Sequence, residues 1–265
     1  MTADGFRHIP PEEFKTLNAL EGFGQNALPP SAALAAQELE VSFDEDGTQR
    51  QTRYSFHGAD ALTWRSEAGD GGDERYDARE VVPGILLVCF SEAQRPERAR
   101  VLVIDTERAI VTRVTSTVVG DDASGRDVEE VFSHGRLPGA AEGDHHPRTD
   151  ELVGHRFQYT YSPHDAYEHV YLTPSTYAWH CLAGEEQGQA DCDRALAYKL
   201  RERVYLLAWH ENVVPCDGIV VLDWVGMRNN GRIFGWDTGA RAYNSIRMGA
   251  IAAPLNFTRY VPLGG

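Results

Sequence analysis

The chain has 265 residues, of which 42% are hydrophobic and 25% are charged. This composition supports one large folded domain or two ordinary ones, and it is unlike that of a disordered chain. The formal net charge of −15 argues against nucleic acid or an anionic membrane as the main partner, because both repel an acidic protein. A solvated acidic surface accounts for the same charge, so the charge alone identifies no function.

Four cysteines occur, and none stands in a C-x-x-C pair: Cys89, Cys181, Cys192 and Cys216. The chain starts without a basic region followed by an apolar core, and no apolar stretch approaches the length of a membrane span. We therefore expect a cytoplasmic protein with reduced thiols. The spacing of Asp144-His145-His146 matches no structural zinc pattern, so no metal site is predicted. No Gly-rich phosphate loop occurs, and no cofactor is predicted.

Residues 1–34 are expected to form an irregular leader with a short helix over Glu12–Leu20. Phe6, Phe14 and Phe23 in this leader are candidates to cover one end of a folded body. A loosely ordered terminus fits the same residues equally well.

From residue 35 the pattern changes to short strands and turns, beginning with the alternating residues Leu39, Val41 and Phe43. Asp46-Gly47 indicates a hairpin. We place the first domain at 35–135 and a linker at 136–151, within a polar stretch over 120–150 that predicts a long loop. Further strands are expected over 53–57, 61–65, 83–91, 100–105 and 109–118.

The same order of elements recurs in a second domain, placed at 152–265. Its strands are expected over 157–161, 168–172, 176–180, 204–208, 219–222 and 232–235, with a hairpin turn at Asn229-Asn230-Gly231. Collinear matches support a duplication of about 115 residues. They pair Trp64 with Trp179, Phe90 with Trp209, Glu92 with Glu211, Asp73-Glu74-Arg75 with Cys192-Asp193-Arg194, and Val101–Ile104 with Ile219–Leu222.

Each unit has seven or eight short antiparallel strands, which predicts a mainly β fold, either a closed barrel or a sandwich. We favour two tandem barrels packed against each other. Bulky aromatic residues occupy alternate strand positions, and an eight-stranded barrel leaves room for one small ligand.

The stretch Val204–Asp217 carries the strongest chemical signal, because an apolar strand runs directly into Trp209-His210-Glu211. A glutamate in an aromatic cavity would have a raised pKa and could carry a proton near neutrality. Tyr159 and Tyr161 face the same side of a strand and offer two O–H donors. His210 should face the opposite side unless a bulge re-aims it. The alternatives are a solvated glutamate and tyrosines that only fill a core.

Leu152–Tyr161 and Val204–Glu211 together resemble the phenolic acid decarboxylases, a family with a small lipocalin-like (calycin) barrel. The resemblance implies that Tyr159 and Tyr161 hold the substrate and that Glu211 acts as general acid. It also makes Trp179, Tyr167, Trp209, His210 and Arg194 candidate substrate-binding residues. The family's carboxylate-binding arginine is replaced here by the stretch Glu185–Gln189, with Arg194 following a few residues later.

The whole chain is similar to the family named molybdenum cofactor biosynthesis protein F (MoaF), through YKLRERVYLLAWHENVVPCDGIVVLD and GRIFGW. The name implies an accessory role in molybdenum cofactor or pterin metabolism.

The main prediction is an acid–base enzyme of the lyase, isomerase or cyclase type, including a decarboxylase. It would need no metal or cofactor and would act on a small hydroxylated or aromatic metabolite in the second barrel. A small-molecule-binding protein without turnover is the competing class. The first unit has Val41 and Phe43 in place of the two tyrosines, so it is expected to be structural or to bind something apolar. A homodimer is left open.

Overall fold

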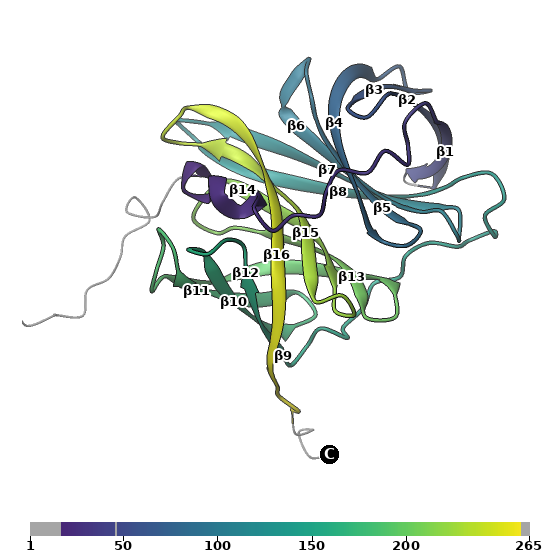
Figure 1. Cartoon of the computed structure of the whole chain (residues 1–265). Helices are drawn as coiled ribbons and strands as arrows, with labels where there is room; N and C mark the ends of the chain where they lie inside the picture. Colours follow the sequence, from purple (N-terminus) through teal and green to yellow (C-terminus); the bar gives the residue numbers. More distant parts are fainter. Residues whose placement is uncertain (1–16, 46, 261–265) are drawn as a thin grey trace, which may run out of the picture.

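The computed structural model describes residues 17–45 and 47–260. The chain forms two closed eight-stranded barrels in which all neighbouring strands are antiparallel. The two barrels follow one another along the sequence and lie side by side (Figure 1). The predicted fold class is therefore confirmed.

The first barrel closes by pairing of its last strand with its first, with Ser42 opposite Arg136. Its last strand, β8, lies inside the stretch that was predicted to be a long loop, so that prediction was wrong. Most β8 residues are at least partly exposed, which is why the strand has little hydrophobic pattern. The strands are β1 (Glu38–Glu45), β2 (Thr48–His57), β3 (Ala61–Ser66), β4 (Gly71–Val82), β5 (Ile85–Glu92), β6 (Arg95–Asp105), β7 (Ile110–Asp121) and β8 (Gly125–Arg136).

The second barrel closes between its long last strand and its first strand, with Ala252 opposite Tyr159. The strands are β9 (His155–Thr160), β10 (Ala166–Thr173), β11 (Thr176–Ala183), β12 (Ala190–Arg201), β13 (Val204–His210), β14 (Cys216–Asp223), β15 (Arg228–Asp237) and β16 (Ala242–Phe257).

Asn229-Asn230-Gly231 is not a hairpin turn, contrary to the prediction, but part of β15 opposite β16. Both asparagines are buried and use their side chains across the structure. Asn229 donates to the Tyr161 hydroxyl over 3.3 Å, and Asn230 accepts a hydrogen bond from the Leu28 amide over 2.7 Å. A side chain at Gly231 would overlap the backbone of β14. The tripeptide resembles a turn signal in sequence, but these tertiary contacts explain why it occurs inside a strand.

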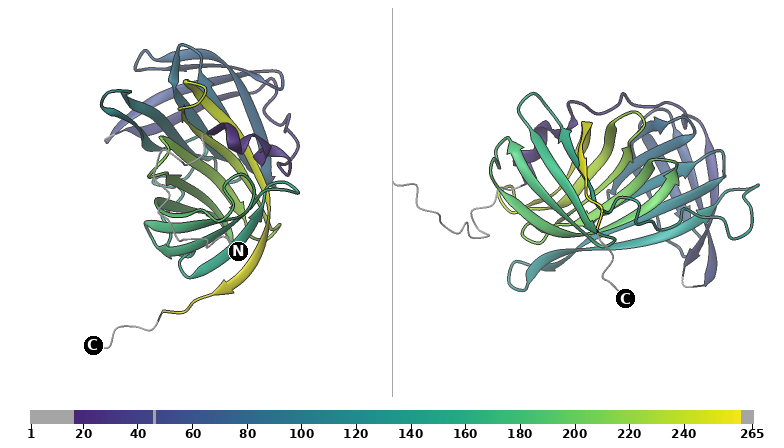
Figure 2. Two further views of the ribbon diagram at one scale, coloured as in Figure 1. Left: turned by 90° about the vertical axis from the view of Figure 1, so that its left-hand side faces the viewer. Right: turned by 90° about the horizontal axis from the view of Figure 1, so that it is seen from below.

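An apolar interface joins the outer faces of the two barrels, and Figure 2 shows their strands side by side. Ile85 and Leu87 on β5 belong to the same buried cluster as Leu206 on β13 and Val221 on β14. These strands are buried on both faces, which is why they are continuously apolar in sequence. The interface also contains a buried polar contact. Arg232 of the second barrel donates hydrogen bonds to Asp217 of the same barrel and to Ser116 of the first barrel.

A 3-10 helix, η2 (Leu17–Gly24), lies over one end of the second barrel and packs mainly on β16 (Figure 1). The predicted helix over Glu12–Leu20 is described only from Leu17, and the helix continues to Gly24. Phe23 is buried and stacks on Tyr161 at 4.3 Å between ring centroids. The prediction that the leader covers a barrel end is thus confirmed for Phe23, whereas Phe6 and Phe14 lie outside the described residues.

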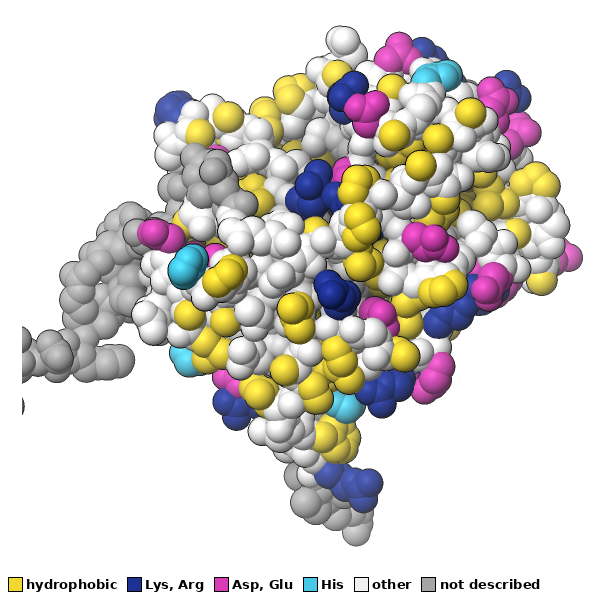
Figure 3. Space-filling model, viewed as in Figure 1, with side chains coloured by type: hydrophobic (Ala, Val, Ile, Leu, Met, Phe, Trp, Pro, Cys, Tyr) yellow, Lys and Arg dark blue, Asp and Glu magenta, His cyan; other side chains and the backbone are white. Residues whose placement is uncertain are grey.

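The chain then crosses from the second barrel to the first. The Asn26 side-chain amide donates to the Thr160 carbonyl over 2.9 Å, and the Ser31 amide donates to the Ala78 carbonyl over 2.8 Å. Across residues 17–45 and 47–260, no helix has the length and apolarity needed to span a membrane. The face in Figure 3 shows charged groups of both signs scattered among apolar ones.

Candidate active site in the second barrel

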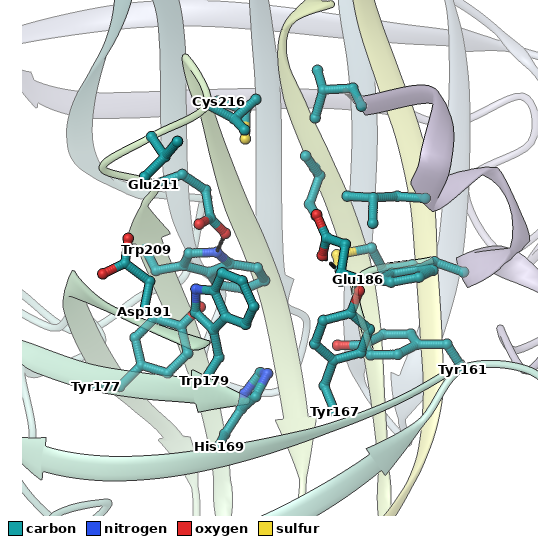
Figure 4. Close-up of a pocket in the computed structure, with 17 residues that line it drawn as sticks. Tyr161, Tyr167, His169, Tyr177, Trp179, Glu186, Asp191, Trp209, Glu211 and Cys216 are labelled. Atoms are coloured by element: carbon teal, nitrogen blue, oxygen red, sulfur yellow. Dashed lines mark hydrogen bonds between the residues drawn. The ribbon is translucent and has the colours of Figure 1, made fainter. Parts of the chain in front are cut away.

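A cavity lies inside the second barrel under η2. Its wall is mostly aromatic and apolar, with three carboxylate side chains, and Figure 4 shows these residues around a central space. The lining residues are Leu17, Leu20, Phe23, Tyr161, Tyr167, His169, Tyr177, Trp179, Glu186, Asp191, Trp209, Glu211, Val213, Val214, Cys216, Ile233 and Met248.

Alternation along β13 places Trp209 and Glu211 on the cavity side. The Trp209 indole N–H donates to Glu211 Oε1 over 2.7 Å, so the ring both forms the wall and holds the carboxyl group. The prediction that these two residues face a cavity agrees with this geometry.

Glu211 is paired with a second carboxyl group, that of Asp193 on β12, which is fully buried. Asp193 accepts hydrogen bonds from the Trp179 indole over 2.8 Å and from the Asn212 amide over 3.2 Å. Burial and the negative charge of Asp193 hold the pKa of Glu211 well above its usual value. Burial also raises the pKa of Asp193, but its hydrogen bonds oppose that rise. The pair therefore keeps a proton on Glu211 and the charge on Asp193.

The two predicted tyrosines both point into the barrel, but they lie at different depths. Tyr161 lines the cavity, where its hydroxyl accepts from Asn229. Tyr159 does not line it; its hydroxyl is bonded to that of Tyr171 at 3.0 Å and accepts from the Trp224 indole at 3.1 Å. Tyr159 is therefore part of a closed hydrogen-bonded cluster beside the cavity, and only Tyr161 is placed to contact a ligand.

Other polar groups of the wall come from β10 and β11 and the turn that follows. The Tyr167 hydroxyl donates to Glu186 over 2.7 Å. His169 is buried, its Nδ1 has no hydrogen-bond partner, and burial lowers its pKa to about 3. The imidazole is therefore neutral at physiological pH.

Two predicted binding residues do not reach the cavity. Arg194 is exposed on the outer face of β12, because Asp193 before it and Ala195 after it point inward. His210 points outward from β13, where it contacts Asp127 at 2.8 Å and Glu130 at 3.2 Å on the first barrel. These acidic partners raise its pKa to about 9 despite partial burial. Strand alternation places both side chains on the outside, so neither lines the cavity as a binding residue. The prediction that His210 faces the side opposite to Glu211 is confirmed.

Asp193, Glu186 and His169 were not among the predicted site residues. A signal existed for Asp193, which the repeat alignment paired with Glu74 of the first unit. No sequence signal indicated His169 or Glu186, because their position depends on how β10 and the turn after β11 fold in the barrel. Within the described ranges, no group of three or more His, Cys, Asp or Glu side chains is arranged to hold a metal ion.

Two family models match the chain: the MoaF N-terminal domain over residues 12–119 and the MoaF C-terminal domain over residues 146–258. The chain belongs to the MoaF family. The C-terminal match spans all eight strands of the second barrel, whereas the N-terminal match includes η2 and ends before β8 of the first barrel.

A relative named protein MoaF from Klebsiella aerogenes is 43% identical over 113 residues. The match spans 42% of this chain and 43% of that relative. Among solved structures, a Burkholderia vietnamiensis protein with a provisional beta-lactamase name matches at 10% identity and a TM-score of 0.34. That match covers 39% of this chain and 95% of the other protein.

Proposed function

We propose that the second barrel is an acid–base enzyme site of the lyase, isomerase or cyclase type, acting on a small hydroxylated or aromatic metabolite. The observation that carries the proposal is the pair formed by Glu211 and Asp193 in an aromatic cavity. A protonated carboxyl group near neutrality is what a general acid requires. The chemistry proposed here uses side chains of the protein itself.

In this mechanism Glu211 delivers its proton to a carbon or oxygen atom of the bound substrate. The Trp209 indole, 2.7 Å from Oε1, orients the carboxyl group and stabilises the carboxylate that forms. The negative charge on Asp193 favours return of a proton to Glu211, so the acid is restored at the end of the cycle. Stacking on the aromatic wall would hold a flat substrate in a fixed orientation.

Among the reactions open to such a site, isomerisation, cyclisation and hydration fit better than decarboxylation. No arginine or lysine occurs among the described lining residues, and Arg194 lies outside. A substrate carboxylate would therefore find no cationic partner among these described residues.

The decisive variant is Glu211→Gln, which keeps the shape of the side chain and removes its transferable proton. Native mass spectrometry and thermal shift against hydroxycinnamates, other phenols and pterins identify ligands, and product analysis identifies turnover. We expect a rate loss of about 10²–10⁴ with little change in affinity. Activity should also fall as the pH rises through the pKa of Glu211, because the acid form disappears.

Tyr159→Phe is the matched control, since Tyr159 lies beside the cavity without lining it; this change should leave the rate nearly unaltered. Full activity of Glu211→Gln would refute the proposed acid. A ligand that binds and is never consumed would instead indicate a binding protein, which the enclosed position under Phe23 also favours. Binding of a pterin alone would support an accessory role in molybdenum cofactor metabolism, as the family name suggests.

A further inference from the structure

One part of the cavity wall belongs to η2 and not to the barrel. Leu17, Leu20 and Phe23 line the cavity at intervals of three residues. A 3-10 helix has three residues per turn, so this spacing places the three side chains on one face. Leu17 and Phe23 are buried, and Figure 4 shows the η2 ribbon next to the lining side chains. The face that η2 turns to the cavity is therefore apolar.

The residues that follow η2 are held by a different kind of contact. The Leu28 amide donates to the buried Asn230 side chain over 2.7 Å. A Cβ atom added at Gly249 would lie 2.2 Å from the Ala27 Cα atom, so the backbone lies directly on β16 here. Residues 26–28, which we call the anchor, are therefore fixed to the second barrel by close packing and hydrogen bonds.

Gly24 lies between η2 and the anchor. A Cβ atom added at Gly24 would meet nothing closer than the Arg247 carbonyl oxygen at 3.5 Å, which is an ordinary contact. The observed position of η2 would therefore accept a side chain here. Glycine allows backbone dihedral changes that other residues resist, and hinges form where a few residues absorb such changes. The freedom of Gly24 is thus available for a second position of η2.

In the observed position η2 rests on two aromatic rings of the barrel. Phe23 stacks on Tyr161 with 4.3 Å between ring centroids and meets Tyr167 edge-on at 5.3 Å. A flat aromatic ligand can stack on Tyr161 in the same way, so it would offset the contact that is lost when Phe23 moves. Movement of η2 by this route leaves the hydrogen bonds of the anchor intact.

We infer that η2 is a lid that controls access to the second barrel. It turns about Gly24, lifts Phe23 from Tyr161 and returns, while the anchor stays bound. The inference rests on the cavity being the ligand site of the proposed function, and it adds how access to that site is regulated. Such a lid sets the rates at which a ligand binds and leaves.

Cys216 provides a reporter of access, because it lies on the cavity wall and is only 2% exposed. N-phenylmaleimide, a flat aromatic thiol reagent, is added to the full-length protein. Peptide mapping by mass spectrometry then gives the labelling rates of Cys216 and of the exposed Cys192. The ratio of these two rates measures access to the cavity, since Cys192 is labelled from the outside.

A disulfide between η2 and the barrel should lock the lid. A Cβ atom added at Gly22 would lie 3.1 Å from Oδ2 of Asp165, in the turn between β9 and β10, so Gly22→Cys with Asp165→Cys brings two thiols within reach. We expect the oxidised double variant to label Cys216, relative to Cys192, at least about tenfold more slowly than the unmodified protein. Gly22→Cys alone, treated with the same oxidant, should keep the unmodified ratio. An unchanged ratio in the double variant, with the disulfide verified by mass, would overturn the inference.

Phe23→Ala makes the opposite change, because it removes the ring that rests on Tyr161. We expect relative labelling of Cys216 to become at least about tenfold faster. Phe257→Ala removes the same ring from an exposed position on β16 and should leave the ratio unaltered. A folded Phe23→Ala protein in which labelling of Cys216 is no faster, or is absent, would also overturn the inference.

The outcome is separable from that of the proposed enzyme, because labelling requires no turnover. Labelling that the disulfide controls, without any turnover, would refute only the enzyme. Turnover together with labelling that is indifferent to the disulfide would refute only the lid.

Discussion

The two barrels share one strand register but differ in what fills them. Phe90 pairs with Arg100 in the first barrel, and at the equivalent place Trp209 pairs with Gly218 in the second. The Arg100 guanidinium lies 3.9 Å from the centre of the Trp64 ring and donates to Glu92 over 2.7 Å. A side chain at Gly218, by contrast, would overlap the indole carbons of Trp209.

This difference shows how a duplicated fold separates stability from ligand binding. In the first barrel the glutamate at the strand end, Glu92, forms ion pairs with Arg95, Arg98 and Arg100. In the second barrel the equivalent Glu211 has no arginine partner among the described residues and faces a cavity. The ion pair between Glu92 and Arg100 therefore occupies the interior of the first barrel. In the second barrel Gly218 has no side chain, which leaves room for the Trp209 ring and for a ligand.

Interior tyrosines of the second barrel are likewise replaced by hydrocarbon side chains in the first. By register, Val41 and Phe43 occupy the places of Tyr159 and Tyr161, and Leu62 occupies that of Tyr177. The second barrel therefore gained or kept hydroxyl groups where the first has hydrocarbon. This supports the hypothesis that the chemistry belongs to the second barrel.

The largest effect should come from the Glu→Gln change in the first barrel. Glu92→Gln leaves Arg100 buried beside a neutral partner, and removal of one member of a buried ion pair costs about 3–5 kcal/mol. Urea unfolding should show this loss, while ligand binding by the folded protein stays normal. Glu211→Gln should show the reverse pattern, with nearly unchanged stability. Equal stability losses for the two variants would break the comparison.

A smaller effect is expected at the position that distinguishes the two interiors. Gly218→Ala pushes the added methyl group into the Trp209 ring, and overpacking of this kind costs about 1–3 kcal/mol. Displacement of the indole should also break its hydrogen bond to Glu211 and weaken ligand binding. Combining the change with Trp209→Phe should recover much of the stability but not the activity, as thermal unfolding and rate assays would show. Additive losses in the double variant would mean that the two residues do not clash.

The smallest effect concerns the contact between the barrels. The folded-state pKa of His210 is raised to about 9 by Glu130 and Asp127, above its unfolded value of about 6.5. Its stabilisation is thus complete below pH 6.5 and disappears as the pH rises through 9. His210→Gln should flatten the decline in unfolding free energy over this window by on the order of 2 kcal/mol. An identical pH dependence of stability in the unmodified protein and in His210→Gln would contradict this prediction, because titration of His210 would then contribute nothing.

Much of the fold could be predicted from local patterns. Alternation at Leu39, Val41 and Phe43, the apolar run from Val204, and the collinear matches predict two tandem β units and favour barrels over sandwiches. Strand alternation also places Trp209 and Glu211 on one face. Such predictions succeed because a half-buried strand imposes a period of two on its residues. Four strands were not predicted: β4, β8, β12 and β16. In β8 most residues are at least partly exposed, so the strand carries almost no such period.

The sequence by itself determined the repeat, the barrel class and one half of the carboxyl pair. Only the tertiary structure decided that Asp193 meets Glu211, that the Tyr159 hydroxyl is hydrogen-bonded to Tyr171 and Trp224, and that Phe23 lines the cavity. Asp193 lies on β12 and Glu211 directly after β13, and Phe23 is far away in sequence from Tyr161 and Tyr167, whose rings it contacts. Closing the barrel fixes these neighbours, and their proximity rather than their identity sets the proton on Glu211.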